Sequence, residues 1–153
     1  MATRFFRGSL RLTILPILLA ALLASPPILA QGADEPTQEE RRAIVQVIRN
    51  QLAAFQRDDG RAAFSFSSGE IQAMFGTSEN FMRMVRAGYA PVYRPKSVLF
   101  LELVTLRGTL VQRVNFVGPN GRPWLAQYPM VRLPDGRWRI NGCFLWPLRG
   151  GAT

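Results

Sequence analysis

Apolar and polar side chains alternate with helical spacing over residues 38 to 57. The apolar positions follow the i, i+3, i+4, i+7 pattern of an amphipathic helix, and they are Ile44, Val47, Ile48, Leu52 and Phe55. Thr37 and Glu40 have the spacing of a capping box, in which each side chain accepts a hydrogen bond from the other residue's backbone N–H. Asp58-Asp59-Gly60 is a typical stop signal. We therefore expect one long helix that buries a single face.

Residues 61 to 88 predict two or three shorter helices. Ser67 and Ser78 are expected to be N-caps, because a serine hydroxyl can accept a hydrogen bond from a free N–H group of the first helical turn. Gly76 is expected to end the helix between them. Pro91 and Pro95 follow, and proline disfavours both helix interiors and central strands. Residues 89 to 95 therefore predict an extended crossover from the helices to a sheet.

From residue 97 onward, β-branched and aromatic residues are interrupted by regularly spaced turn signals. The pattern predicts four strands, near residues 97 to 106, 109 to 117, 122 to 133 and 137 to 146. Gly118–Arg122 and Leu133–Arg137 share the sequence x-Pro-Asx-Gly-Arg, which is typical of three-residue hairpin loops with a left-handed glycine. A shorter turn at Arg107-Gly108 would pair Leu106 with Thr109.

The three turns predict the register of the sheet, because strand pairing follows from turn geometry. One face then collects mainly apolar residues, which are Leu99, Leu101, Leu103, Thr105, Leu110, Gln112, Val114, Phe116, Trp124, Ala126, Tyr128, Met130, Trp138, Ile140, Phe144 and Trp146. We expect an α+β domain in which a long N-terminal helix and two or three short ones cover this inner face of a four-stranded antiparallel meander.

The outer face of the predicted sheet is only half polar. Its apolar members are Val98, Phe100, Val104, Leu125 and Val131. Exposed apolar patches often mark protein interfaces, so a homodimer through the outer face is one hypothesis. A chain terminus or a returning helix covering the face is the other.

The first thirty residues have the n, h and c regions of a signal peptide. Arg4, Arg7 and Arg11 precede an uncharged run over residues 12 to 24. Pro16 interrupts the run and leaves it shorter than a membrane span requires, so we expect cleavage, after Ala30 or after Ala33. The expected organisation is a cleaved signal peptide (1–30), a flexible N-terminus (31–36), one domain (37–148) and a disordered tail (149–153). The mature chain would be exported, periplasmic or secreted, with no membrane span.

The amino-acid composition excludes several classes of catalytic and metal-binding site. The chain has 19 basic and 10 acidic residues, a formal net charge of +9, no histidine and one cysteine. Without histidine, the usual hydrolytic triads and the commonest metal ligand are excluded, so no catalytic residue, metal or cofactor is expected. Export makes nucleic acid an unsuitable partner for the charge, whereas anionic lipid, lipopolysaccharide or an acidic protein fits it. The favoured alternative is a basic surface that is simply solvated. Cys143 cannot form an intrachain disulfide; we expect a buried, inert thiol, with intermolecular pairing as the alternative.

Glu102 is an acid within an apolar strand, which is one pattern of a general base. The predicted register instead places it opposite Arg113 on the outer face, where a structural ion pair explains both residues.

A candidate pocket is expected on the inner face, where the register places Gln112 opposite Tyr128. Aromatic and polar neighbours would complete it; they are Thr105, Trp124, Trp138, Tyr89 and Tyr93. The alternative is a closed core in which these polar groups satisfy one another.

Several motifs resemble a family of exported proteobacterial proteins. They are Ile48-x-x-Gln51-Leu52-x-x-Phe55, Phe75-Gly76, Tyr89-x-Pro91-Val92-Tyr93-Arg94-Pro95, Gly121-x-x-Trp124, Asp135-Gly136-x-Trp138-Arg139-Ile140 and Gly142-Cys143. The family is domain of unknown function 4864, and the resemblance implies no activity or catalytic residues. The element order also resembles the nuclear transport factor 2-like, or cystatin-like, group, which implies helices packed into a curved sheet as a cone. Isomerases of that fold work with a carboxylate and tyrosines, and the inner face expected here has tyrosine but no acid.

Three functions remain open. The leading hypothesis is a non-enzymatic module that binds a small apolar ligand or an envelope protein. The second is a small isomerase or lyase that uses Tyr128. The third is an electrostatic binder of anionic envelope polymers through its arginines.

Overall fold

A computed structural model describes residues 35–149 of the chain. The expected signal peptide with both expected cleavage sites, most of the segment expected to be a flexible N-terminus and the last four residues of the expected tail lie outside the described residues. None of the described helices is both long and apolar enough to cross a membrane.

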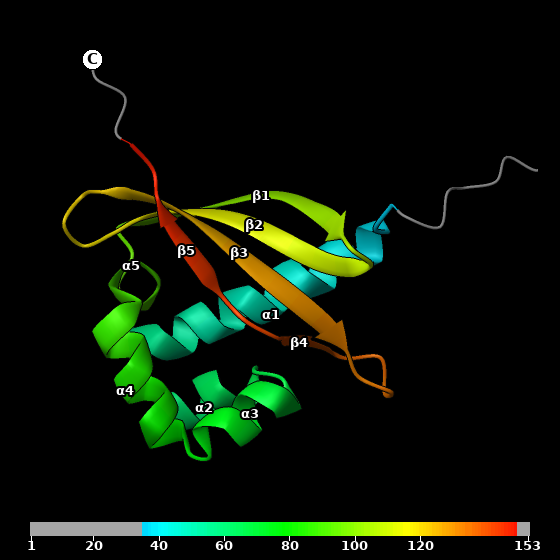
Figure 1. Ribbon diagram of the computed structural model, residues 1–153, viewed down its shortest axis with the longest axis horizontal. Coiled ribbons are helices and arrows are strands. Elements are labelled where there is room, and N and C mark those ends of the chain that lie inside the picture. The colour runs from blue at the N-terminus through cyan, green and yellow to red at the C-terminus, as the bar shows by residue number, and fades with distance from the viewer. Residues whose placement is uncertain (1–34, 150–153) are drawn as a thin grey trace, which may run out of the picture. The chain divides into compact units, whose positions relative to one another are not determined.

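Five helices precede five strands along the described chain. The helices are α1 (Gln38–Gln56), α2 (Gly60–Ser65), α3 (Gly69–Phe75), α4 (Ser78–Gly88) and α5 (Ala90–Tyr93). The strands are β1 (Ser97–Leu106), β2 (Thr109–Val117), β3 (Pro123–Arg132), β4 (Trp138–Ile140) and β5 (Phe144–Pro147). The helices lie together on one side of the antiparallel sheet, and α1 runs across it (Figure 1). The expected α+β class, with helices first and a sheet after them, is confirmed.

The capping box of α1 is present. The Thr37 hydroxyl accepts a hydrogen bond from the Glu40 N–H at 3.2 Å, and the Glu40 carboxylate accepts one from the Thr37 N–H at 2.9 Å. Ile44 and Ile48 on the apolar stripe of the helix are fully buried. The sequence pattern therefore placed both the start and the buried face of α1.

Two expected N-caps were wrong by one residue. Ser68 caps α3 and Thr77 caps α4, rather than Ser67 and Ser78, because their oxygens accept from N–H groups three residues on at 3.2 Å. Gly76 ends α3 with a φ of 71°, as expected.

The segment expected to be extended also differs, because residues 90 to 93 form the single-turn helix α5. Pro91 lies in its first turn, where the missing N–H has no intrahelical partner to lose.

All three hairpin turns have the expected pairing. The N–H of Gly118 donates to the carbonyl of Arg122 at 2.9 Å, and the N–H of Leu133 donates to the carbonyl of Arg137 at 2.8 Å. Leu106 pairs with Thr109.

Two irregularities change which residues face the helices. In β1 the register shifts between Phe100 and Leu103, so Phe100 pairs with Val114 and packs on the core, while Leu99 is 60% exposed. The expectation that Leu99 faces inward and Phe100 outward was therefore wrong, because one extra residue in a strand reverses its faces.

The second irregularity breaks the expected fourth strand into β4 and β5, which both pair with β3. Ile140 pairs with Met130, but Leu145 pairs with Ala126, so one residue is gained between them. Phe144 and Trp146 consequently turn away from the helices and are 54% and 45% exposed, contrary to their expected inner position.

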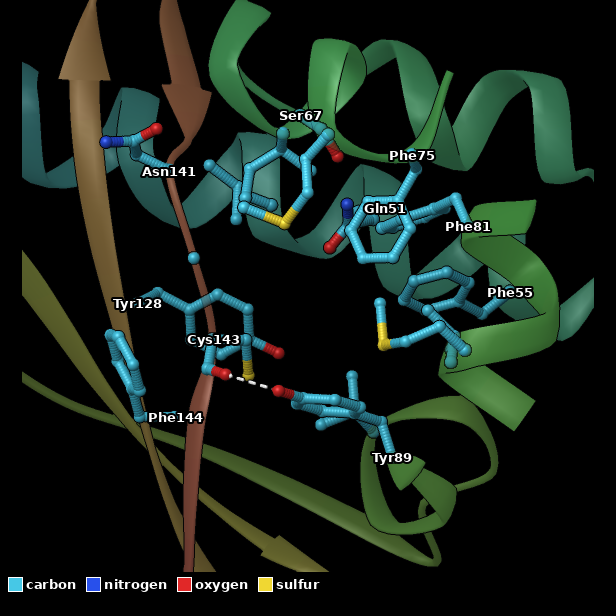
Figure 2. Close-up of a pocket in the computed structure, with 17 residues that line it drawn as sticks. Gln51, Phe55, Ser67, Phe75, Phe81, Tyr89, Tyr128, Asn141, Cys143 and Phe144 are labelled. Atoms are coloured by element: carbon cyan, nitrogen blue, oxygen red, sulfur yellow. Dashed lines mark hydrogen bonds between the residues drawn. The ribbon is translucent and has the colours of Figure 1, made fainter. Parts of the chain in front are cut away.

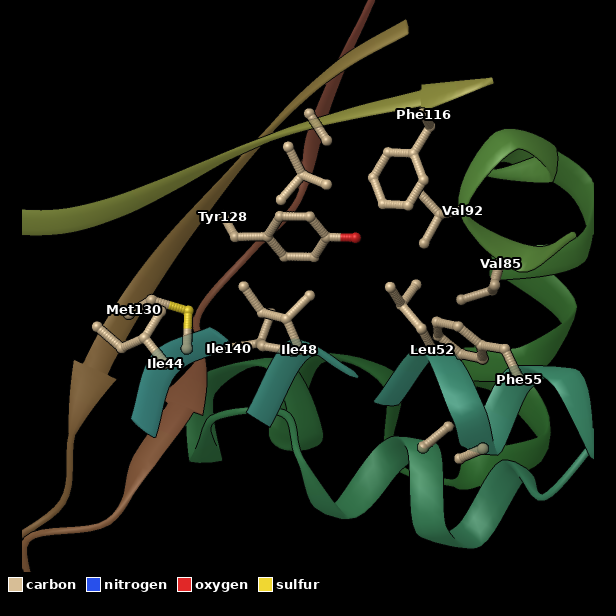
Figure 3. Packing of buried hydrophobic residues seen from close by; sticks show 14 of the residues in the cluster. Ile44, Ile48, Leu52, Phe55, Val85, Val92, Phe116, Tyr128, Met130 and Ile140 are labelled. Atoms are coloured by element: carbon tan, nitrogen blue, oxygen red, sulfur yellow. The ribbon is translucent and has the colours of Figure 1, made fainter. Parts of the chain in front are cut away.

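The core lies between α1 and the sheet. Figure 3 shows Ile44, Ile48 and Leu52 of α1 below Tyr128, which extends from β3 toward the helices. The close packing of these side chains fixes the helices against the sheet.

Gly60→Ala is expected to lower the free energy of unfolding by roughly 1 to 3 kcal/mol, the usual range for overpacking. The added Cβ would lie 2.6 Å from Cγ of Met82, a buried residue of α4. Gly69→Ala is the matched control, because Gly69 also begins a short helix but has no atom within 4 Å of its Cβ position. Urea unfolding followed by tryptophan fluorescence measures both; equal stability of the two variants would contradict the close α2–α4 contact.

Candidate functional site

A cavity of about 460 Å³ lies between the helices and the sheet (Figure 2). Helices α1, α3, α4 and α5 supply apolar walls, among them Phe55, Phe81 and Val92. Tyr128 of β3 and the segment from Ile140 to Phe144 close the sheet side. The volume falls within the roughly 300 to 1,000 Å³ that small-molecule sites occupy.

The exposed side of the cavity, its mouth, is marked by Met74 on α3, which is 73% exposed and is the most exposed of the lining residues. The Phe144 ring points away from the cavity (Figure 2) and is tilted against the Trp146 ring, with ring centroids 6.2 Å apart. The most exposed part of the lining is therefore apolar.

The break between β4 and β5 forms one wall, and hydrogen bonds hold it. The Ser68 N–H donates to the carbonyl of Ile140 at 2.8 Å, and the Ser68 hydroxyl donates to Oδ1 of Asn141 at 2.5 Å. The Tyr89 hydroxyl donates to the carbonyl of Cys143 at 2.9 Å, the bond drawn in Figure 2. Helical residues thus satisfy backbone groups that the sheet ladder leaves free at the break.

Tyr128 is the unusual polar group of the cavity. It is fully buried, and its hydroxyl oxygen has no hydrogen-bond partner among the described residues. Burial raises the pKa of Tyr128 well above its ordinary value, and the nearby Cys143 and Tyr89 raise it further. Cys143 is close enough to affect this pKa, but the two side chains do not make a hydrogen bond of good geometry. Buried polar groups usually have hydrogen-bond partners, so the Tyr128 hydroxyl is an exception. It is protonated and can still donate a hydrogen bond.

Gln51 and Cys143 add further polar atoms to the lining. Gln51 of α1 is 4% exposed; its Nε2 donates to the carbonyl of Ala63 at 3.1 Å, and its amide faces the cavity in Figure 2. Burial raises the pKa of the Cys143 thiol to about 12, although Tyr128 lowers it slightly, so the thiol is protonated at neutral pH.

Of the seven residues expected to form the pocket, the structure brings Tyr89 and Tyr128 to this cavity, and the other five do not line it. Gln112 does pair with Tyr128 in the register, but its Nε2 donates to the carbonyls of Leu101 and Arg113 at 2.8 and 2.9 Å. The Gln112 amide therefore hydrogen-bonds the irregular backbone of β1 instead of Tyr128.

The remaining expected pocket residues have separate surroundings. The Arg94 guanidinium lies 3.9 Å from the centre of the Tyr93 ring, and the Tyr93 hydroxyl bonds Asp58. Trp138 packs beneath Arg132, whose guanidinium carbon is 5.8 Å from its ring centre. Trp124 is half-buried against the core and Thr105 pairs with Leu110 across β1 and β2.

Glu102 and Arg113 form an ion pair outside the cavity. A hydrogen bond to its own backbone, followed by the charge of Arg113, lowers the pKa of the Glu102 carboxyl. Glu102 lies within the β1 irregularity rather than directly opposite Arg113, and it does not line the cavity.

Sequence reasoning missed the helical lining of the cavity. Gln51 was the one available signal, since an amide within the apolar stripe of α1 indicates a buried polar contact. Phe75, Phe81 and Met84 gave none, because their orientation depends on how α3 and α4 pack. Over residues 35–149 no group of three or more His, Cys, Asp or Glu side chains could hold a metal ion.

Neither a curated protein nor a solved structure is significantly similar to the chain. The family model described as Domain of unknown function (DUF4864) matches residues 37–153. This range includes every helix and strand given above and all residues that line the cavity, and the match confirms the family expected from the sequence motifs. The chain belongs to the family of the Domain of unknown function (DUF4864).

Proposed function

We propose that this domain binds a small, mainly apolar molecule in the cavity between its helices and its sheet, without catalysing a reaction. The observation that carries the proposal is the combination of apolar walls, an open mouth and the unpartnered hydroxyl of Tyr128. Apolar surface gives affinity and a few placed polar groups give orientation, which is the usual composition of a small-molecule site.

The isomerase or lyase alternative has less support. Proton transfer by Tyr128 would need a carboxylate within hydrogen-bonding reach, and the residues that line the cavity include no Asp, Glu, Lys or Arg. The raised pKa of Tyr128 also keeps it from acting as a phenolate base at neutral pH.

The electrostatic alternative is weakened because several arginines are already paired. Arg86 and Arg94 both contact Asp58, at 3.5 and 2.8 Å. Arginines that share a carboxylate contribute less to binding an anionic polymer than unpaired ones do.

We further propose that the domain acts in the exported compartment and that its fold is related to the nuclear transport factor 2-like group. The signal-peptide pattern of residues 1–30 supports export, and helices packed on one side of an antiparallel sheet support the relationship. An envelope protein is the alternative occupant of the apolar mouth.

A neutral fluorescent probe, N-phenyl-1-naphthylamine, is expected to bind with saturation at one site per chain. Met74→Arg should raise its Kd at least five-fold, because a charge at the apolar mouth must be desolvated by the probe. Ala73→Arg is the control, since Ala73 is exposed on the same helix but does not line the cavity. Fluorescence titration measures both variants; linear, unsaturable binding or equal weakening by both arginines would overturn the proposal.

The Cys143 thiol is expected to resist alkylation in the folded domain. With a pKa of about 12 instead of 9, roughly one thiol in ten thousand is ionised at pH 8, and the thiolate is the reactive form. Iodoacetamide labelling followed by mass spectrometry should be at least a hundred-fold slower than in urea, where the pKa returns to its ordinary value. Similar rates in both conditions would show that the thiol is not enclosed.

The homodimer expected through the outer sheet face remains a prediction. The exposed apolar residues of this face are Leu99, Phe144 and Trp146, of which Leu99 and Trp146 lie in one row across the paired strands. Light scattering should give twice the chain mass, and Trp146→Glu should halve it. A monomer mass for the unmodified chain would exclude this interface.

A further inference from the structure

We propose that the cavity selects uncharged ligands that carry a hydrogen-bond acceptor, and that the hydroxyl of Tyr128 donates to that acceptor. This inference rests on the proposed binding function and adds the chemical class of the ligand.

The preference for uncharged ligands follows from the residues that line the cavity. Its polar contributors among the described residues are neutral, namely Gln51, Ser67, Tyr89, Tyr128, Asn141 and Cys143. A carboxylate or ammonium entering this space would lose its hydration without gaining an opposite charge, which disfavours it strongly. Fatty acids and amines therefore fit the cavity poorly, although their chains would suit its walls.

The need for a hydrogen-bond acceptor on the ligand follows from the hydrogen bonds that the lining side chains already make. The Tyr89 proton is used by the carbonyl of Cys143, at 2.9 Å, and the Gln51 amide donates to Ala63 at 3.1 Å. The Tyr128 hydroxyl makes no such bond and is fully buried. Its raised pKa keeps the proton in place at neutral and alkaline pH. A carbonyl or ether oxygen on the ligand would supply the missing partner.

The burial of Tyr128 determines how a ligand would be oriented in the cavity. Tyr128 has no exposed surface, whereas Met74 at the mouth is 73% exposed. A ligand would therefore enter acceptor first and leave its apolar body against Phe55, Phe81 and Val85, which line the helical wall. An apolar ligand without an acceptor would leave the Tyr128 hydroxyl unpaired and sealed from water, which lowers affinity.

Three naphthalene derivatives of similar shape test whether the cavity prefers uncharged ligands with a hydrogen-bond acceptor. They are 2-acetylnaphthalene with a ketone oxygen, 2-isopropenylnaphthalene with carbon in its place, and 2-naphthoate with a negative charge. Displacement of N-phenyl-1-naphthylamine gives their affinities. We expect the ketone to bind about ten-fold more tightly than the hydrocarbon, as one unpaired buried group implies, and the carboxylate to bind most weakly.

Tyr128→Phe assigns the effect to one atom, because it removes the hydroxyl and keeps the ring. The ketone should then bind no more tightly than the hydrocarbon, whose own affinity should not fall. Tyr93→Phe is the matched control, because the Tyr93 hydroxyl bonds Asp58 and Tyr93 does not line the cavity, and it should keep the ketone preference. If Tyr128→Phe does not fold, as judged by circular dichroism, the ranking of the three compounds on the unmodified chain decides alone.

The outcomes separate the two proposals. Equal affinity for ketone and hydrocarbon, or tighter binding of naphthoate, would overturn this inference and leave the binding function standing. A ketone preference that survives in Tyr128→Phe would overturn the role of Tyr128. Failure of all compounds and of the fluorescent probe to bind would overturn the binding function, and this inference with it.

Discussion

The backbone between Ile140 and Phe144 leaves the β3 ladder, and both the cavity and the exposed surface depend on that departure. One extra residue there reverses the faces of the strand, so Leu145 pairs inward with Ala126 while Phe144 moves to the exposed outer face. Continuous pairing would have placed Phe144 and Trp146 beneath the helices. Two large aromatic rings would then have occupied space near Tyr128.

The irregular backbone is stable because side chains from the helical half replace the missing ladder bonds. Ser68 binds Ile140 and Asn141, and Tyr89 binds Cys143. A buried peptide group without a partner is costly, so these bonds connect the helices to the last two strands. The same residues thereby position the cavity wall, which makes the architecture of the site inseparable from that of the fold.

Local chemistry explains which parts of the fold could be predicted from the sequence. The capping box of α1 and the Pro-Asx-Gly turns have their signals within a few residues, and they formed as expected. The shift in β1 had no such signal. Residues 98 to 104 are apolar on both faces apart from Glu102, so either register buries hydrophobic side chains and the pattern does not distinguish them.

The site was only partly predictable for a related reason. Tyr128 was found because its strand position is determined by a reliable turn, whereas Gln112 was assigned to it without knowledge of the β1 irregularity that binds its amide. The helical wall depends on how α3 and α4 pack, and no short motif encodes that arrangement.

The cavity also has a consequence for how long the protein survives. Under the proposed binding function, a ligand that binds only the folded state would raise the stability of the domain. The empty form would open more often and meet proteases more often than the filled form. If the domain binds a ligand as proposed, the abundance of the protein would follow the supply of that ligand, and turnover would report whether the molecule is present.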